Sequence, residues 1–66
     1  LPSAYLPLLK RVMSDYQVDI YTDQDLERLV RVKQGDVRNV LSGAQQMIEA
    51  FYEARPLLTP PVLPAP

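Results

Sequence analysis

The chain contains no cysteine, histidine or tryptophan, and it has only two glycines among its 66 residues. Without cysteine and histidine it lacks disulfides, thiol nucleophiles, imidazole acid–base groups and the usual ligands of zinc. Two isolated glycines also exclude a glycine-rich phosphate-binding loop. We therefore expect no enzymatic activity, no cofactor and no metal site in this chain.

Long apolar segments are missing as well. No apolar run approaches the roughly 18 residues of a membrane-spanning helix, and no signal-peptide pattern is present. A chain without disulfides suits a reducing compartment, so we expect an intracellular protein, cytoplasmic or nuclear, that makes no membrane contact. Because the chain starts at Leu1 without methionine, we also expect it to be a piece of a larger protein.

Proline is concentrated at one end of the chain. Five of the seven prolines lie in residues 56–66, where helix and central strand are both disfavoured. We predict an extended, partly polyproline-II tail there and a foldable part over residues 1–55. The tail contains Pro61-Val-Leu-Pro64, a minimal ligand pattern for aromatic grooves, although the absence of Lys and Arg from the tail favours a plain linker.

The first segment with helical spacing lies near the N-terminus. We expect it to begin between Ser3, a possible N-cap, and Pro7, which suits the first helical position. Its apolar residues recur at helical spacing and form one stripe: Leu6, Leu9, Val12, Met13 and Tyr16.

A second helix is predicted to begin at Thr22, which with Asp25 forms a variant of the capping box. Glu27 and Arg31 are spaced for an exposed ion pair, and Gly35 is expected to end the helix. The inward residues are Leu26, Leu29 and Val30. Carboxylates cluster in the first turns at Asp23, Asp25 and Glu27, and we assign them to capping and solvation rather than to catalysis or metal binding.

A third helix is predicted to follow Asp36 as its N-cap. Its stripe comprises Val37, Val40, Leu41, Ala44, Ile48 and Phe51. Ser42-Gly43 lies inside it, so the segment forms either one helix or two that meet at Ser42, and we favour one. Residues 17–21 are expected to form a loop whose Val18 and Ile20 fill the core.

The sequence therefore predicts an all-α fold. Residues 1–55 form a small bundle of three helices, or of four if the third divides, and residues 56–66 form the extended proline-rich tail. The burial of few apolar side chains has to offset the conformational entropy that about fifty residues lose on folding. We therefore expect the isolated module to be marginally stable and to gain stability from a partner.

Nucleic-acid binding is one alternative. The second and third predicted helices and their short turn suit a helix-turn-helix whose outer face would read bases through Arg38, Asn39, Ser42, Gln45 and Gln46. Phosphate contacts would come from Lys10, Arg11, Arg28, Arg31, Lys33 and Arg38. The net charge of −1 and the isoelectric point of about 5.1 oppose this alternative, because phosphate electrostatics dominate DNA affinity.

Two segments resemble parts of the replication machinery. Gln45-Gln46-Met47-Ile48-Glu49-Ala50-Phe51-Tyr52 resembles the box that docks proteins on the sliding clamp PCNA, which presents an aliphatic and two aromatic side chains. Residues 21–45 are similar to the helical lid of AAA+ clamp-loader subunits of the replication factor C type, through a Tyr-Thr-Asp cap and Gly35-Asp36-Val37-Arg38. The second resemblance implies that Arg38 senses nucleotide phosphates, although no Walker motif is present.

The interpretation we favour is a non-catalytic docking module of a larger protein or complex, one that serves DNA replication if these resemblances hold. Its partner would be another protein or a second copy of the chain. Aromatic, methionine and leucine side chains beyond those that a thin core needs are the predicted anchors: Tyr5, Leu8, Met47, Phe51, Tyr52, Leu57 and Leu58.

Overall fold

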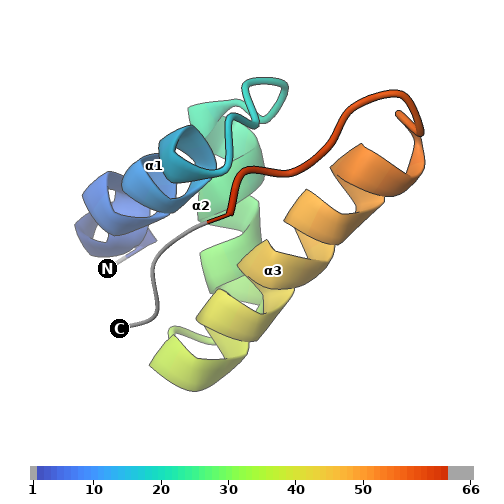
Figure 1. Cartoon of the computed structure of the whole chain (residues 1–66). Coiled ribbons are helices and arrows are strands. Elements are labelled where there is room, and N and C mark those ends of the chain that lie inside the picture. Colours follow the sequence, from blue (N-terminus) through green and yellow to red (C-terminus); the bar gives the residue numbers. More distant parts are fainter. Residues whose placement is uncertain (1, 63–66) are drawn as a thin grey trace.

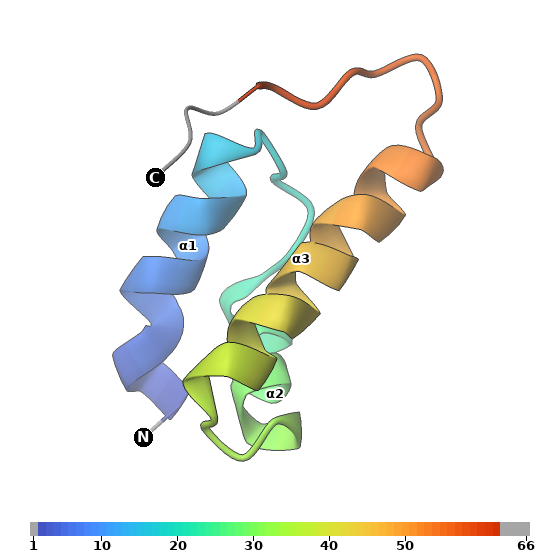
Figure 2. The ribbon, with the colours of Figure 1, turned by 60° about the horizontal axis from the view of Figure 1, so that its bottom comes forward.

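The computed structural model describes residues 2–62, with Leu1 and residues 63–66 outside the described part (Figure 1). A 3-10 turn, η1 (Pro2–Tyr5), precedes three α-helices, α1 (Leu6–Asp15), α2 (Asp23–Val32) and α3 (Val37–Glu53). Residues 2–62 contain no strand, so the predicted all-α, three-helix fold is confirmed. The helices α1 and α3 run in the same general direction and α2 runs opposite to them (Figures 1 and 2). Each helix packs against the other two.

The helix α1 begins at Leu6, inside the predicted range, and Pro7 lies in its first turn. Tyr5 occupies the N-cap position without a side-chain hydrogen bond to the helix. Ser3 belongs to η1, so its predicted role as the N-cap is wrong. The 3-10 turn takes the place of a side-chain cap, because it leads the backbone directly into the α-helix.

The end of α1 explains why one residue of the following loop reaches the core and another does not. Gln17 adopts a left-handed conformation with φ of 59°, and the Val18 N–H donates to the Met13 carbonyl at 2.8 Å. This is the Schellman motif, which brings the side chains of Met13 and Val18 together. Val18 is accordingly buried, as predicted, but Ile20 is 47% exposed and its predicted place in the core is wrong. Tyr21 packs against the core instead, just before the chain enters α2.

The start of α2 confirms the predicted capping box. The Thr22 Oγ1 accepts the Asp25 N–H at 3.1 Å, and the Asp25 Oδ2 accepts the Thr22 N–H at 2.9 Å. Further along the helix, Glu27 and Arg31 form the predicted ion pair at 3.6 Å on the exposed side. Local side-chain chemistry therefore fixes where α2 begins.

The connection from α2 to α3 is a tight turn with two left-handed residues. The first is Gln34, with φ of 55°, and Gly35 follows with φ of 72° and donates its N–H to the Val30 carbonyl at 3.0 Å. The first left-handed position after the helix, where glycine is commonest, is thus occupied by Gln34. Gly35 follows it and also adopts a left-handed conformation, which glycine accommodates without strain. Asp36 caps α3 as predicted, since its Oδ1 accepts the Asn39 N–H at 3.2 Å.

The helix α3 runs without a break through Ser42-Gly43, so the single-helix alternative is confirmed. Gly43 is buried where α2 crosses α3. A Cβ at this position would lie 2.5 Å from Leu29 Cδ1 and 3.3 Å from Lys33 Cε. The glycine therefore allows a close approach of α2 that a side chain would obstruct.

In the described part of the chain, the core consists of nine buried side chains contributed by the three helices and the first loop: Leu9, Met13, Val18, Leu26, Val30, Val40, Ala44, Ile48 and Phe51. Two residues of the predicted α3 stripe lie outside it, since Val37 is 50% exposed and Leu41 is 39% exposed. Val37 occupies the first turn, beyond the end of the core, and Leu41 lies on the flank of the stripe that faces α1.

Three tyrosines connect elements that are distant in the sequence. Each ring is half-buried and its hydroxyl donates to a backbone carbonyl, in the pairs Tyr5 to Gly35 at 2.8 Å, Tyr21 to Met47 at 2.8 Å, and Tyr52 to Tyr16. The hydroxyls thereby find backbone partners at the turn before α3, within α3 and at the C-cap of α1. These bonds fix how η1, the loops and α3 sit against one another.

The packing at Gly43 gives a first prediction. Glycine to alanine in a helix is expected to stabilise by about 1 kcal/mol, but the clash with Leu29 offsets that gain. We expect Gly43→Ala alone to give no gain in the free energy of unfolding, and to give about 1 kcal/mol in a Leu29→Ala background. Urea unfolding of the four chains measures both values. A full gain from Gly43→Ala in the native background would contradict the close approach.

Candidate docking groove between α1 and α3

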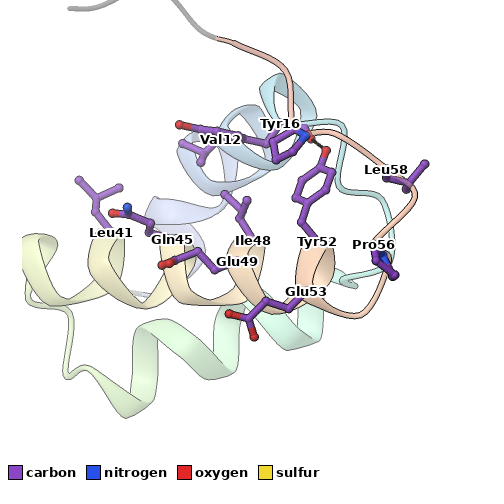
Figure 3. A pocket seen from close by; sticks show the side chains of 11 residues that line it. Val12, Tyr16, Leu41, Gln45, Ile48, Glu49, Tyr52, Glu53, Pro56 and Leu58 are labelled. Atoms are coloured by element: carbon purple, nitrogen blue, oxygen red, sulfur yellow. Dashed lines mark hydrogen bonds between the residues drawn. The ribbon is translucent and has the colours of Figure 1, made fainter.

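A groove of about 620 Å³ lies between α1 and α3 and is closed at one end by the segment that follows α3 (Figure 3). The helix α3 supplies most of its lining at spacings of three and four residues. The lining residues are Val12 from α1 and Tyr16 from its C-cap; Leu41, Gln45, Ile48, Glu49, Tyr52 and Glu53 from α3; and Pro56, Leu58 and Pro60 from the tail. The groove is thus an apolar channel with polar groups on its α3 side.

Tyr52 forms the inner end of the groove. Its hydroxyl donates to the Tyr16 carbonyl, which spans the gap between α3 and α1 (Figure 3). Its ring meets that of Phe51 edge to face, with centroids 4.9 Å apart and planes at 81°. The Arg55 guanidinium lies 4.0 Å from the centroid of the Phe51 ring and donates to the Phe51 carbonyl at 3.1 Å. These contacts hold the Tyr52 ring in one place and leave its exposed side facing the groove.

The tail turns back over this end of the molecule. After α3, the Leu58 N–H donates to the Arg55 carbonyl at 3.0 Å, and residues 54–62 continue without helix or strand. Both ribbon views show this segment returning from the end of α3 toward the end of α1 (Figures 1 and 2). Leu58 therefore reaches the groove while remaining 52% exposed, whereas Leu57 is 97% exposed and lies outside its lining.

The predicted anchors do not form one surface. Tyr52 and Leu58 line the groove, and the other five lie elsewhere. Phe51 is only 5% exposed and belongs to the core, so a partner cannot reach it in this structure. Tyr5 is half-buried in its bond to Gly35, and Met47 lines a separate shallow pocket beside α2. Leu8 is exposed on α1, away from the groove lining.

Several groove residues were missed as docking residues because they fit the expected core stripes. Val12, Tyr16, Leu41 and Ile48 repeat at helical spacing, and such spacing alone does not separate a core face from a groove wall. Only the angle between α1 and α3 decides which of them stay accessible. One sequence feature indicated these residues: the apolar stripes on α1 and α3 are both wider than a single packed helix face requires.

The predicted base-reading residues all lie exposed on α3: Arg38, Asn39, Ser42, Gln45 and Gln46. This helix and its cap carry a single cation, Arg38, against Asp36, Glu49 and Glu53. A negative recognition helix would be repelled by phosphates.

Three of the six expected phosphate-binding cations are engaged in ion pairs. Lys10, Arg11 and Arg31 form ion pairs with Asp23, Asp15 and Glu27 at 3.4, 3.4 and 3.6 Å. Lys33 is half-buried beside Gly43. Within residues 2–62, Arg28, Lys33 and Arg38 form no ion pair, and Arg28 and Arg38 lie on different helices, α2 and α3.

The segment that resembles the sliding-clamp box is built into the bundle. Gln45 is exposed, but Ile48 and Phe51 are 6% and 5% exposed and form part of the core. A clamp box presents these apolar side chains to its partner, so the present packing would have to open before such docking. Arg38, the residue that the clamp-loader resemblance places near phosphates, is exposed in the first turn of α3.

The carboxylates at the start of α2 all take part in local structure. Asp23 pairs with Lys10, Asp25 completes the capping box, and Glu27 pairs with Arg31. No group of three or more potential ligands in the described part of the chain is placed to hold a metal ion. None of its helices combines the length and apolar character needed to cross a membrane.

Comparison of the chain with protein-family models, curated proteins and solved structures gives no match. The resemblances to the clamp-loader lid and to the sliding-clamp box therefore stay predictions.

The bond between Tyr52 and Tyr16 gives a second prediction. Tyr52→Phe removes the hydroxyl but keeps the ring, so we expect a loss of about 1 kcal/mol in the free energy of unfolding with unchanged helix content. Tyr16→Phe is the matched control, because within residues 2–62 the Tyr16 hydroxyl makes no hydrogen bond, and this change should be nearly neutral. Denaturant unfolding followed by circular dichroism measures both. Equal stability of the two variants would show that the bond contributes nothing.

Proposed function

We propose that this chain is a non-catalytic docking module that binds another protein in the groove between α1 and α3. The observation that carries the proposal is an open channel of about 620 Å³ whose walls are mainly apolar and whose floor belongs to the core. Single exposed apolar residues are normal on protein surfaces, whereas apolar residues gathered around a concave site are typical of binding surfaces. Leu41, Leu58 and Tyr52 are the members of this group that a partner would cover.

The small core supports the same proposal. Nine buried side chains serve a domain that lacks any disulfide, and domains of this size bury a smaller fraction of their surface than larger ones. A partner seated in the groove would bury Leu41 and Leu58 and the remaining face of Tyr52. Binding would therefore add apolar burial to that of the small core.

DNA binding has less support. The negative balance on α3 and the engagement of Lys10, Arg11 and Arg31 in ion pairs leave little charge for phosphate contacts. A duplex-binding module should bind nonspecific DNA at low salt and lose that binding as salt rises. We expect no such binding from this chain.

Selection from a phage-displayed library of random peptides, about 16 residues long, tests the proposal. We expect enriched peptides whose affinity falls roughly ten-fold or more when Leu41→Ser and Leu58→Ser are combined in the chain. The matched control is Val32→Ser, which removes a 66% exposed apolar side chain outside the groove and should leave affinity unchanged. Fluorescence anisotropy measures the affinities, and circular dichroism checks that each variant is folded. No enrichment, or equal effects of groove and control variants, would contradict the proposal.

A further inference from the structure

We infer that the occupant of the groove is an amphipathic helix from another protein, with a lysine or arginine beside its apolar face. This inference rests on the docking function proposed above and specifies the partner's chemistry. The shape of the groove and the charges along its α3 side support it.

The walls of the groove favour a helical occupant. Both main walls are α-helices, whose backbone groups are already bonded within each helix. An extended peptide would find no strand edge to pair with, whereas a helix satisfies its own backbone. From Leu41 to Tyr52 the α3 wall extends over about 16 Å at 1.5 Å per residue, which matches about three turns of a docked helix. Such a helix would present apolar anchors at spacings of three, four and seven residues.

The charges on the α3 side indicate a cation on the partner. Five carboxylates in the described part of the chain have local roles: Asp15, Asp23 and Glu27 form ion pairs, and Asp25 and Asp36 cap helices. Within residues 2–62, Asp19, Glu49 and Glu53 have neither an ion pair nor a capping bond. Two of these three line the groove.

The positions of Glu49 and Glu53 are unfavourable for the isolated helix. They are spaced as i and i+4, where like charges repel each other, and Glu53 is the last residue of α3, where the helix dipole disfavours negative charge. The nearest cation in sequence, Arg55, is placed over the Phe51 ring. A lysine or arginine from a docked helix would relieve both effects, so the charge complement of this edge is positive.

A second copy of the chain fits the groove less well. In a two-fold contact through this face, each copy would present the same carboxylate-lined edge to the other. Glu49 and Glu53 would then approach one another or remain unpaired at an interface, which opposes association. A partner of different sequence avoids this conflict.

The same peptide selection, extended by charge reversal, tests the inference. We expect peptides selected on the native chain to carry Lys or Arg flanking apolar residues at helical spacing. A selected peptide should bind roughly two- to ten-fold more weakly to Glu49→Lys or Glu53→Lys, and raising the ionic strength from about 0.05 to about 0.5 M should weaken its binding to the native chain. Asp19→Lys is the matched control, with the same charge change outside the groove, and should have little effect.

The outcomes separate this inference from the docking function. Peptides that depend on Leu41 and Leu58 but carry no excess cation, or that respond equally to Glu53→Lys and Asp19→Lys, would overturn the inference and leave the docking function standing. Peptides indifferent to Leu41 and Leu58 would overturn both. Sedimentation equilibrium provides a further arm, because a native dimer that Leu41→Ser converts to a monomer would identify a second copy as the occupant and overturn the inference.

Discussion

The close approach of α2 to α3 at Gly43 is the constraint on which the rest of the bundle depends. A Cβ there would lie 2.5 Å from Leu29 Cδ1, so the absence of a side chain at Gly43 makes room for the Leu29 side chain between the two helices. With α3 held against α2, α1 covers the remaining core residues of both. The nine buried side chains fill the space between the three helices. They do not fill the junction of α1 with α3, where an accessible channel remains. The groove is therefore a consequence of how a small core is distributed.

Polar contacts compensate for the limited size of that core. Three tyrosine hydroxyls reach backbone carbonyls 26 to 36 residues away in the sequence. A tyrosine ring covers apolar surface while its hydroxyl finds a backbone carbonyl as its hydrogen-bond partner. At the groove one such bond, from Tyr52 to Tyr16, joins α3 to α1, so the wall of the docking site is also part of the tertiary framework. Folding and the proposed binding are thereby linked through one side chain.

Local chemistry made much of this fold predictable. The capping box at Thr22 and the cap at Asp36 depend only on neighbouring residues, so the starts of α2 and α3 followed from the sequence. Tertiary packing decided the rest. The burial of Val18 rather than Ile20 follows from the left-handed Gln17, and glutamine gives no strong indication of that conformation. The accessibility of Leu41 depends on the angle between α1 and α3, and the spacing of apolar residues in the sequence does not determine that angle. The candidate site was therefore predicted only in part.

Intermolecular NOEs provide the most direct test of the central claim that this groove is the docking site. The chain, labelled with carbon-13 in its methyl groups, would be studied in complex with a peptide selected on it. We expect NOEs from the peptide to the methyl groups of Val12, Leu41, Ile48 and Leu58, which line the groove. NOEs confined to Leu29 and Val32, at the separate pocket beside α2, would contradict it.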